Sequence, residues 1–211
     1  MKCLSSKRKK IGRSGIMKNK IRISLAFIIT LLVHIGCQPA PYTPKPRGFF
    51  KIDFPEREYV HANTGCPFDI EIPGYSLLVA DPSQTKHTCW KNVDFPQFNA
   101  RLHLSYYRIS PSAPFDYLTE DARTFVFKHT AKATSIDQKS IQHNDHNLYG
   151  VAYSIRGNTA SNYQFYVSDS TTHYLRGALY FNEKPHLDSI QPVLDFLKED
   201  IRHMISTIRW K

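Results

Sequence analysis

The stretch that decides the fold is residues 148–182, which read LYGVAYSIRGNTASNYQFYVSDSTTHYLRGALYFN. Two turn-forming pairs, Gly157-Asn158 and Asp169-Ser170, divide this stretch into three segments. Apolar and polar residues alternate in each segment, so every second side chain lies on the same face of an extended chain. We therefore predict a C-terminal β-meander, packed against other elements because its hairpins carry too many aromatic side chains to stay exposed.

The rest of the chain predicts further strands before the meander and two main helices. The strands cover 68–72, 75–80 and 100–109, and the helices cover 114–132 and 190–208. Apolar residues recur at every third or fourth position in both helices, which indicates one buried face on each. Since the elements do not alternate as βαβ units, we predict an α+β fold, a mostly antiparallel sheet with two main helices packed on it. This order is similar to that of the PsbP/Mog1-like α/β/α sandwich.

The positive charge of the chain is concentrated near its N-terminus. The formal net charge is +10, and nine basic residues without any acidic residue precede Cys37. Removing these nine charges leaves +1, so the remainder is nearly neutral. Nucleic-acid binding requires basic side chains gathered on the folded surface, and we predict no nucleic-acid partner.

Residues 1–36 have the pattern of a signal peptide, in which Met17 is a possible true start. Basic residues precede an apolar run at 23–33, and Gly36 stands directly before Cys37. A small residue followed by cysteine is typical of lipoproteins, although His34 stands where leucine is usual. We predict lipidation of Cys37, with palmitate among the acyl groups. An ordinary signal peptide or an uncleaved anchor is the alternative.

The residues after Cys37 predict a spacer followed by one domain. Four prolines lie between Pro39 and Pro46, which favours an extended segment. We therefore assign 37–50 to a lipidated cysteine with a proline-rich tether, and 51–211 to a single globular α+β domain.

Two cysteines remain in this predicted domain, Cys66 and Cys89. An isolated pair in an oxidising compartment most often forms a disulfide, which we predict here. Metal binding is the alternative, with His87 as the nearest further ligand, but it needs more ligands at short spacing. We predict no metal site and no cofactor.

No pattern in the chain predicts catalytic residues. The nucleophile elbow, the phosphate-binding loop and the zinc-protease helix are all missing from the sequence. Asp169, Ser170, His173 and Arg176 have the residue types of a hydrolase triad, but all four fall in one turn region, whereas triads usually draw their members from separate elements. His129 lies on the apolar stripe of its predicted helix, which favours a core histidine with one hydrogen bond.

Strand alternation predicts a candidate interaction surface on the meander. If Tyr163, Phe165 and Val167 fill the core, then Tyr166 points outward together with Tyr174, Arg176 and Tyr180. Tyrosine and arginine are the residues that most often anchor protein interfaces. The alternative is that a helix covers this second face of the sheet. The basic flank of the first helix, which includes Arg123 and Lys128, is either a solvated face or a docking surface for an acidic partner.

Several short motifs occur in a fixed order along the chain: YTPKPRGFF (42–50), CPF (66–68), CW (89–90), HLSY (103–106), KHTAKA (128–133), GNTAS (157–161), QFY (164–166), LRGALYFN (175–182) and WK (210–211). In these motifs the chain resembles the gliding motility lipoprotein GldD family of the Bacteroidetes. The resemblance implies a non-enzymatic accessory or scaffold component that supports gliding motility and the type IX secretion machinery through protein partners.

The same resemblance implies a place in the cell envelope, facing the periplasm. Gln38 follows Cys37, instead of the aspartate that commonly retains lipoproteins at the inner membrane, so we favour the outer membrane. The alternative function is a periplasmic hydrolase or ligand-binding domain that acts on an envelope component.

Overall fold

The computed structural model describes residues 20, 22–28, 51–81, 89–184 and 186–211. The chain divides into two units, Met1–Gly48 and Phe49–Lys211. In the first unit, the described residues 22–28 are helical. None of the helices among the described residues has both the length and the apolar character that a membrane span requires.

Seven antiparallel strands among the described residues form a large sheet in the order β3-β4-β5-β9-β8-β7-β6. The strands are β3 (Leu77–Ala80), β4 (Trp90–Phe95), β5 (Ala100–Arg108), β6 (Ala133–His143), β7 (Leu148–Gly157), β8 (Ser161–Ser168) and β9 (His173–Phe181). The last three strands are the predicted meander. Strand β6 lies at one edge of the sheet, so one of its backbone edges has no neighbouring strand within the sheet.

A smaller antiparallel sheet has the order β1-β2-β10, with β1 (Tyr59–Cys66), β2 (Phe68–Pro73) and β10 (Arg209–Trp210). The two long helices are α2 (Phe115–Phe127) and α3 (Leu187–Thr207), and 3-10 turns cover Pro96–Phe98, Lys128–Ala131 and Asn144–His146. The fold is therefore α+β with antiparallel sheets, as predicted. The sequence analysis missed β1, β4, β6 and β10.

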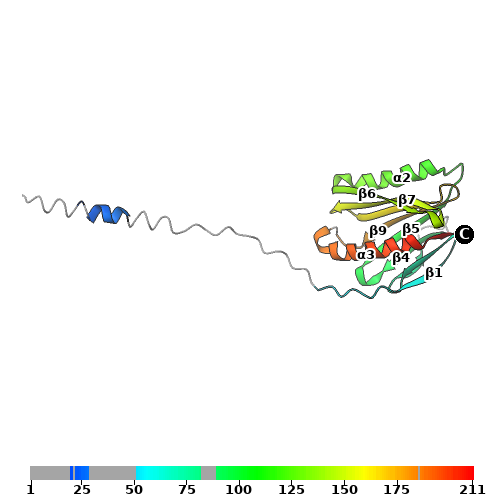
Figure 1. The fold of residues 1–211 in the computed structure, drawn as a ribbon, viewed down its shortest axis with the longest axis horizontal. Helices are drawn as coiled ribbons and strands as arrows, with labels where there is room; N and C mark the ends of the chain where they lie inside the picture. The colour runs from blue at the N-terminus through cyan, green and yellow to red at the C-terminus, as the bar shows by residue number, and fades with distance from the viewer. Residues whose placement is uncertain (1–19, 21, 29–50, 82–88, 185) are drawn as a thin grey trace, which may run out of the picture. The chain divides into compact units, whose positions relative to one another are not determined.

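The two long helices cover opposite faces of the large sheet (Figure 1). On one face, α3 and the small sheet enclose the main core, where Leu197, Ile201 and Met204 of α3 are fully or almost fully buried. On the other face, Leu118, Ala122 and Val126 of α2 are buried against the meander. The predicted helices are confirmed, and the resulting layers are helix, sheet and helix.

A close contact between β8 and β9 places a large aromatic side chain in the core of the meander. Phe165 pairs with Gly177 across β8 and β9, and the aromatic ring occupies the space above the glycine. A Cβ atom at position 177 would lie only 2.1 Å from that ring, so no larger residue fits there. This close approach lets a large aromatic side chain sit in the core without separating the two strands.

Two of the connections between the small sheet and the rest of the domain are a disulfide and a buried carboxylate. Cys66 and Cys89 form the predicted disulfide, with 5.5 Å between their Cα atoms, and it joins the end of β1 to the residue before β4. Because the two strands belong to different sheets, this bond crosses from one sheet to the other.

The second connection is a carboxylate of α3, Asp200, which is 0% exposed. Its Oδ1 atom accepts hydrogen bonds from Arg57 Nε at 3.0 Å and from the Tyr59 hydroxyl at 2.8 Å. Its Oδ2 atom accepts a hydrogen bond from the Tyr75 hydroxyl. Burial, together with the hydrogen bond to Asp200, raises the pKa of Tyr59 to about 12, so this tyrosine remains a donor at neutral pH. We call these four residues the Asp200 network.

Candidate functional site

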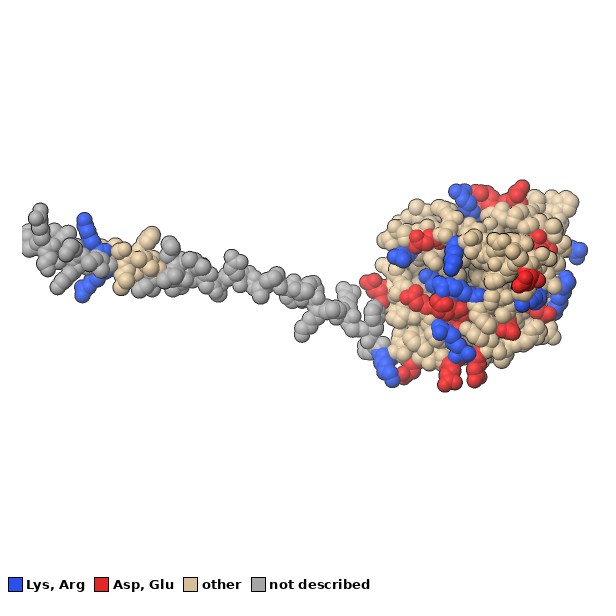
Figure 2. All heavy atoms as spheres, viewed as in Figure 1, with Lys and Arg blue, Asp and Glu red and all other residues tan. Residues whose placement is uncertain are grey.

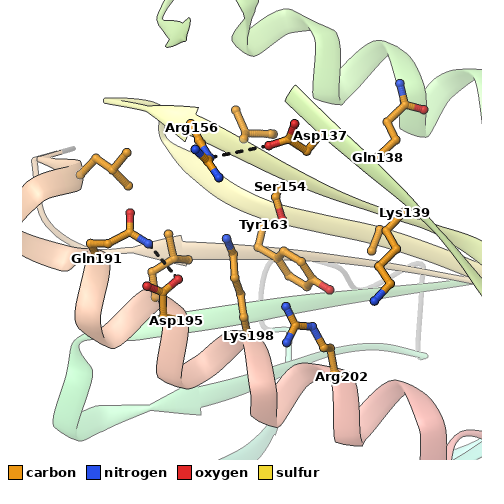
Figure 3. Close-up of a pocket in the computed structure, with 14 residues that line it drawn as sticks. Asp137, Gln138, Lys139, Ser154, Arg156, Tyr163, Gln191, Asp195, Lys198 and Arg202 are labelled. Carbon is orange, nitrogen blue, oxygen red and sulfur yellow. Dashed lines mark hydrogen bonds and ion pairs between the residues drawn. The ribbon is translucent and has the colours of Figure 1, made fainter. Parts of the chain in front are cut away.

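A groove of about 740 Å³ lies between α3 and the outer strands β6 and β7 (Figure 3). Its floor carries small side chains, since Ala152 and Ser154 of β7 face α3 here. Tyr163 of β8 forms the part of the floor nearest the helix. The groove exists because these small residues do not reach across to α3.

The polar side chains of the helix wall are Gln191, Asp195, Lys198 and Arg202, which follow one another at spacings of four, three and four. That spacing places the four side chains on one face of a helix. Leu197 and Ile201 lie between them in the sequence and are buried in the core, whereas Leu194 is buried in the core and also lines the groove. One side of the amphipathic helix therefore holds the core while its flank supplies the groove.

The strand wall comes from the sheet edge, where Asp137 and Lys139 of β6 line the groove. Arg156 of β7 forms an ion pair with Asp137, with 3.7 Å between Nε and Oδ2. Figure 3 shows Lys139, Lys198 and Arg202 pointing toward Tyr163 from opposite sides of the groove. The groove thus gathers basic side chains from elements that are far apart in the sequence.

A second hollow of about 300 Å³ continues the groove along α3. The two hollows share Lys139, Ala152, Tyr163 and Arg202, and the second one extends to Ser206. Its lining also includes two isoleucines, Ile141 of β6 and Ile205 of α3. We use the name α3 groove for the two hollows together.

Burial affects the charged groups of the α3 groove unequally. Lys198 is partly buried beneath the sheet edge, and this desolvation lowers the pKa of its ammonium group. Its Nζ atom lies 5.7 Å from the centre of the Tyr163 ring. Arg202 also forms an ion pair with Glu199, at the outer side of the helix. Asp195 accepts a hydrogen bond of 2.8 Å from Gln191.

The residues of the predicted interaction surface share the face opposite the α3 groove, but helix α2 covers half of them. Tyr174 is 1% exposed, and its hydroxyl donates to the Leu118 carbonyl oxygen of α2 at 2.9 Å. Tyr166 stacks on Tyr174 with 5.5 Å between ring centres. The expectation that both tyrosines point outward is therefore wrong, because the second face of the meander is a helix-packing surface.

Arg176 and Tyr180 lie on the same face, beyond the main contact with α2. Arg176 donates to Gln164 Oε1 at 2.8 Å, and its guanidinium lies 4.5 Å from the centre of the Phe125 ring. Both residues line a separate pocket of about 250 Å³, together with Asn92 and His103. Burial lowers the pKa of the His103 imidazole, with a further contribution from Arg101.

The four residues with hydrolase-like types are not arranged as a triad. The Oδ1 atom of Asp169 accepts from three backbone N–H groups of its own turn, at Thr171, Thr172 and His173. The His173 Nδ1 atom lies 2.8 Å from the Tyr106 hydroxyl. Ser170 has a φ of 68°, as expected of a tight turn. These residues therefore build and brace the turn between β8 and β9.

His129 is half-buried on the 3-10 turn Lys128–Ala131 and is not part of the core, and its Nε2 atom lies 3.1 Å from Gln164 Nε2. His146 is the last residue of the 3-10 turn Asn144–His146, and His143 directly precedes this turn. Across the residues that the structure describes, no group of three or more histidine, cysteine, aspartate or glutamate side chains is arranged to hold a metal ion. Cys37 and His87 lie outside the described residues.

Sequence reasoning missed the α3 groove. The spacing of Gln191, Asp195, Lys198 and Arg202 was available as a polar flank beside the apolar stripe of the helix. The opposite wall depends on β6, whose existence the sequence pattern did not reveal. No single motif could therefore have identified the groove.

Comparisons with known proteins find similar solved structures and a matching family model. The solution structure of cyanobacterial PsbP (CyanoP) from Synechocystis sp. PCC 6803 matches with 9% sequence identity and a TM-score of 0.43, covering 80% of this chain and 100% of that chain. A search of curated protein sequences finds no significant match. The family model described as gliding motility lipoprotein GldD matches residues 39–210, which is most of the chain. The chain therefore belongs to the GldD family of gliding motility lipoproteins.

Proposed function

We propose that this lipoprotein is a non-enzymatic accessory component that supports gliding motility and the type IX secretion machinery through protein contacts. The observation that carries the proposal is the α3 groove, an elongated surface with charged walls and a partly apolar floor. Such a mixture suits a polypeptide, since it offers both ion pairs and apolar contact. Elsewhere on the visible face of the domain, basic and acidic side chains are interspersed (Figure 2).

We further propose that Cys37 anchors the protein in the cell envelope, at the periplasmic side of the outer membrane. Membership in a lipoprotein family supports the anchor. The proline-rich residues 39–46 would act as a spacer between the lipid and the domain.

The anchor proposal predicts that Cys37→Ala abolishes acylation, because this substitution removes the thiol that would carry the lipid. Growth with radioactive palmitate should label the wild-type protein and leave the Cys37→Ala protein unlabelled and mislocalised. Cys3→Ala serves as the matched control and should be labelled like the wild type. Full labelling of the Cys37→Ala protein would refute the proposed anchor.

The groove proposal predicts that Ser154→Trp abolishes gliding and type IX secretion, because the indole ring would fill the floor of the α3 groove. The variant is expressed from the native locus, and cell movement and secreted protein are measured. Ser112→Trp is the matched control, since Ser112 is exposed in the turn before α2 and lies outside the groove. Both proteins must reach wild-type levels and melt cooperatively. Normal gliding by a folded Ser154→Trp strain would remove the groove from the proposal.

A second candidate function, a ligand-binding domain acting on an envelope component, is favoured by one observation. Asn92 is 1% exposed in the pocket that Arg176 and Tyr180 line, and neither its Nδ2 nor its Oδ1 atom has a hydrogen-bond partner among the described residues. An unpaired buried amide is costly, so a small bound molecule could satisfy it. Asn92→Leu separates the two functions, since loss of gliding in a folded protein would favour the ligand-binding reading.

A further inference from the structure

The spacing of the positive charges along the α3 groove matches the spacing of side chains on an extended polypeptide. Lys198 and Arg202 are four residues apart on α3, which places them about 6 Å apart along the helix axis. In an extended chain, side chains on one face recur every second residue, about 6.6 Å apart. Two acidic side chains separated by a single residue therefore match the spacing of the two cations.

The length of the groove limits the length of this ligand. The polar part of its helix wall runs from Gln191 to Ser206, which are fifteen positions apart and span about 22 Å of helix. An extended chain covers this distance with about seven residues. Lys139 on the opposite wall adds a third cation near the middle of this span.

The remaining lining favours a protein segment over a compact anion such as phosphate. Asp137 and Asp195 line the same groove and would repel a concentrated negative charge. The cations are spread along the groove, and Ile141, Tyr163 and Ile205 supply an apolar surface between and beyond them. A segment that alternates acidic and other side chains can use both kinds of surface.

We infer that the α3 groove binds an extended segment of about seven residues from a partner protein, in which two acidic side chains are separated by one residue and contact Lys198 and Arg202. This inference rests on the proposed function, because it specifies the chemistry of the partner. The groove would then select a partner segment by the spacing of its acidic residues and not only by their charge.

The test is a binding titration with the full-length lipoprotein in mild detergent. The first fluorescein-labelled probe is Ser-Thr-Glu-Thr-Glu-Thr-Ser, and the second is its isomer Ser-Thr-Thr-Glu-Glu-Thr-Ser. Fluorescence anisotropy should show that the first probe binds about fivefold more tightly, since only alternating glutamates place both carboxylates on the side of the two cations. A third probe, Ser-Thr-Lys-Thr-Lys-Thr-Ser, should not bind the wild type.

Charge reversal supplies the second arm of the test. K198E/R202E should lose the alternating glutamate probe by tenfold or more and should gain the alternating lysine probe, because its helix wall then has the opposite sign. K128E/K132E is the matched control, since it makes the same change of charge on exposed residues outside the groove. It should bind the glutamate probe like the wild type.

Equal binding of the two glutamate isomers would overturn the inference, and so would unchanged binding by K198E/R202E. Competition by inorganic phosphate or by phosphatidylglycerol vesicles, at concentrations similar to those of the peptide, would show a site for compact anions instead. If these peptides fail while the Ser154→Trp strain still loses gliding, the groove remains the contact site but its partner is not acidic. If folded Ser154→Trp cells glide normally, the groove is not the contact site, and both its part in the proposed function and this inference fail.

Discussion

Replacing Asp200 by alanine is expected to lower the free energy of unfolding by about 2–4 kcal/mol. The carboxylate is 0% exposed and accepts hydrogen bonds from Arg57, Tyr59 and Tyr75, which are themselves only partly buried. Alanine would leave the two partly buried hydroxyl groups without their acceptor and would leave a small cavity. Urea-induced unfolding of the wild-type and variant proteins, followed by circular dichroism, measures the difference.

Asp195→Ala is the matched control for this experiment, because Asp195 is an exposed aspartate on the same helix. Surface substitutions of this kind usually change stability by less than about 0.5 kcal/mol. If Asp200→Ala were as mild as this control, the Asp200 network would not contribute to holding the small sheet against α3.

A chain that ends at Glu183 is expected not to fold at all. Helix α3 supplies Leu194, Leu197, Ile201 and Met204 to the main core, where each is 1% exposed or less. Without them one face of the large sheet would be exposed to water, which a domain of marginal stability does not tolerate. Thermal unfolding followed by circular dichroism should show no cooperative transition.

A point substitution in α3 tests the contribution of this helix to the core without removing the helix. Leu197→Ala should cost about 2–5 kcal/mol through lost transfer energy and a cavity, whereas Glu199→Ala on the exposed side should be nearly neutral. A cooperative melt from the truncated chain would instead mean that α3 is docked on a core that is complete without it.

Most of the elements that the sequence predicted have one clearly apolar face, although β3 does not. The meander, β2, β5 and the two helices all combine regular periodicity with large buried side chains. Strand β6 has eleven residues but only two large apolar ones, Ile136 and Ile141, and most of its side chains are exposed. An edge strand does not need an apolar face of its own, because hydrogen bonds to β7 hold it in place.

The face of each meander residue could be predicted, but its burial could not. Tyr166, Tyr174 and Arg176 do share one face, as strand alternation requires. Whether that face meets water or a helix depends on where α2 packs, and no local pattern contains this information. The α3 groove was harder still to predict from the sequence, because one of its walls comes from α3 and the other from β6, which the sequence pattern did not predict.

The Asp200 network and the disulfide together define a path for mechanical load. If the protein is anchored through Cys37, tension reaches the domain just before β1, where Phe54 stacks on Phe196 with 4.5 Å between ring centres. Tyr59 and Pro73 form the open end of the β1–β2 hairpin, so pulling there would unzip the pair one hydrogen bond at a time. The hydrogen bond from Tyr59 to Asp200 holds this end of the hairpin in place. If the two strands nevertheless separated, the separation would stop at Cys66, because its disulfide bond transmits the force to Cys89, the residue before β4. Phe196 and Asp200 belong to α3, the helix that also forms one wall of the α3 groove, so tension on the anchor would reach the binding surface as well as the disulfide.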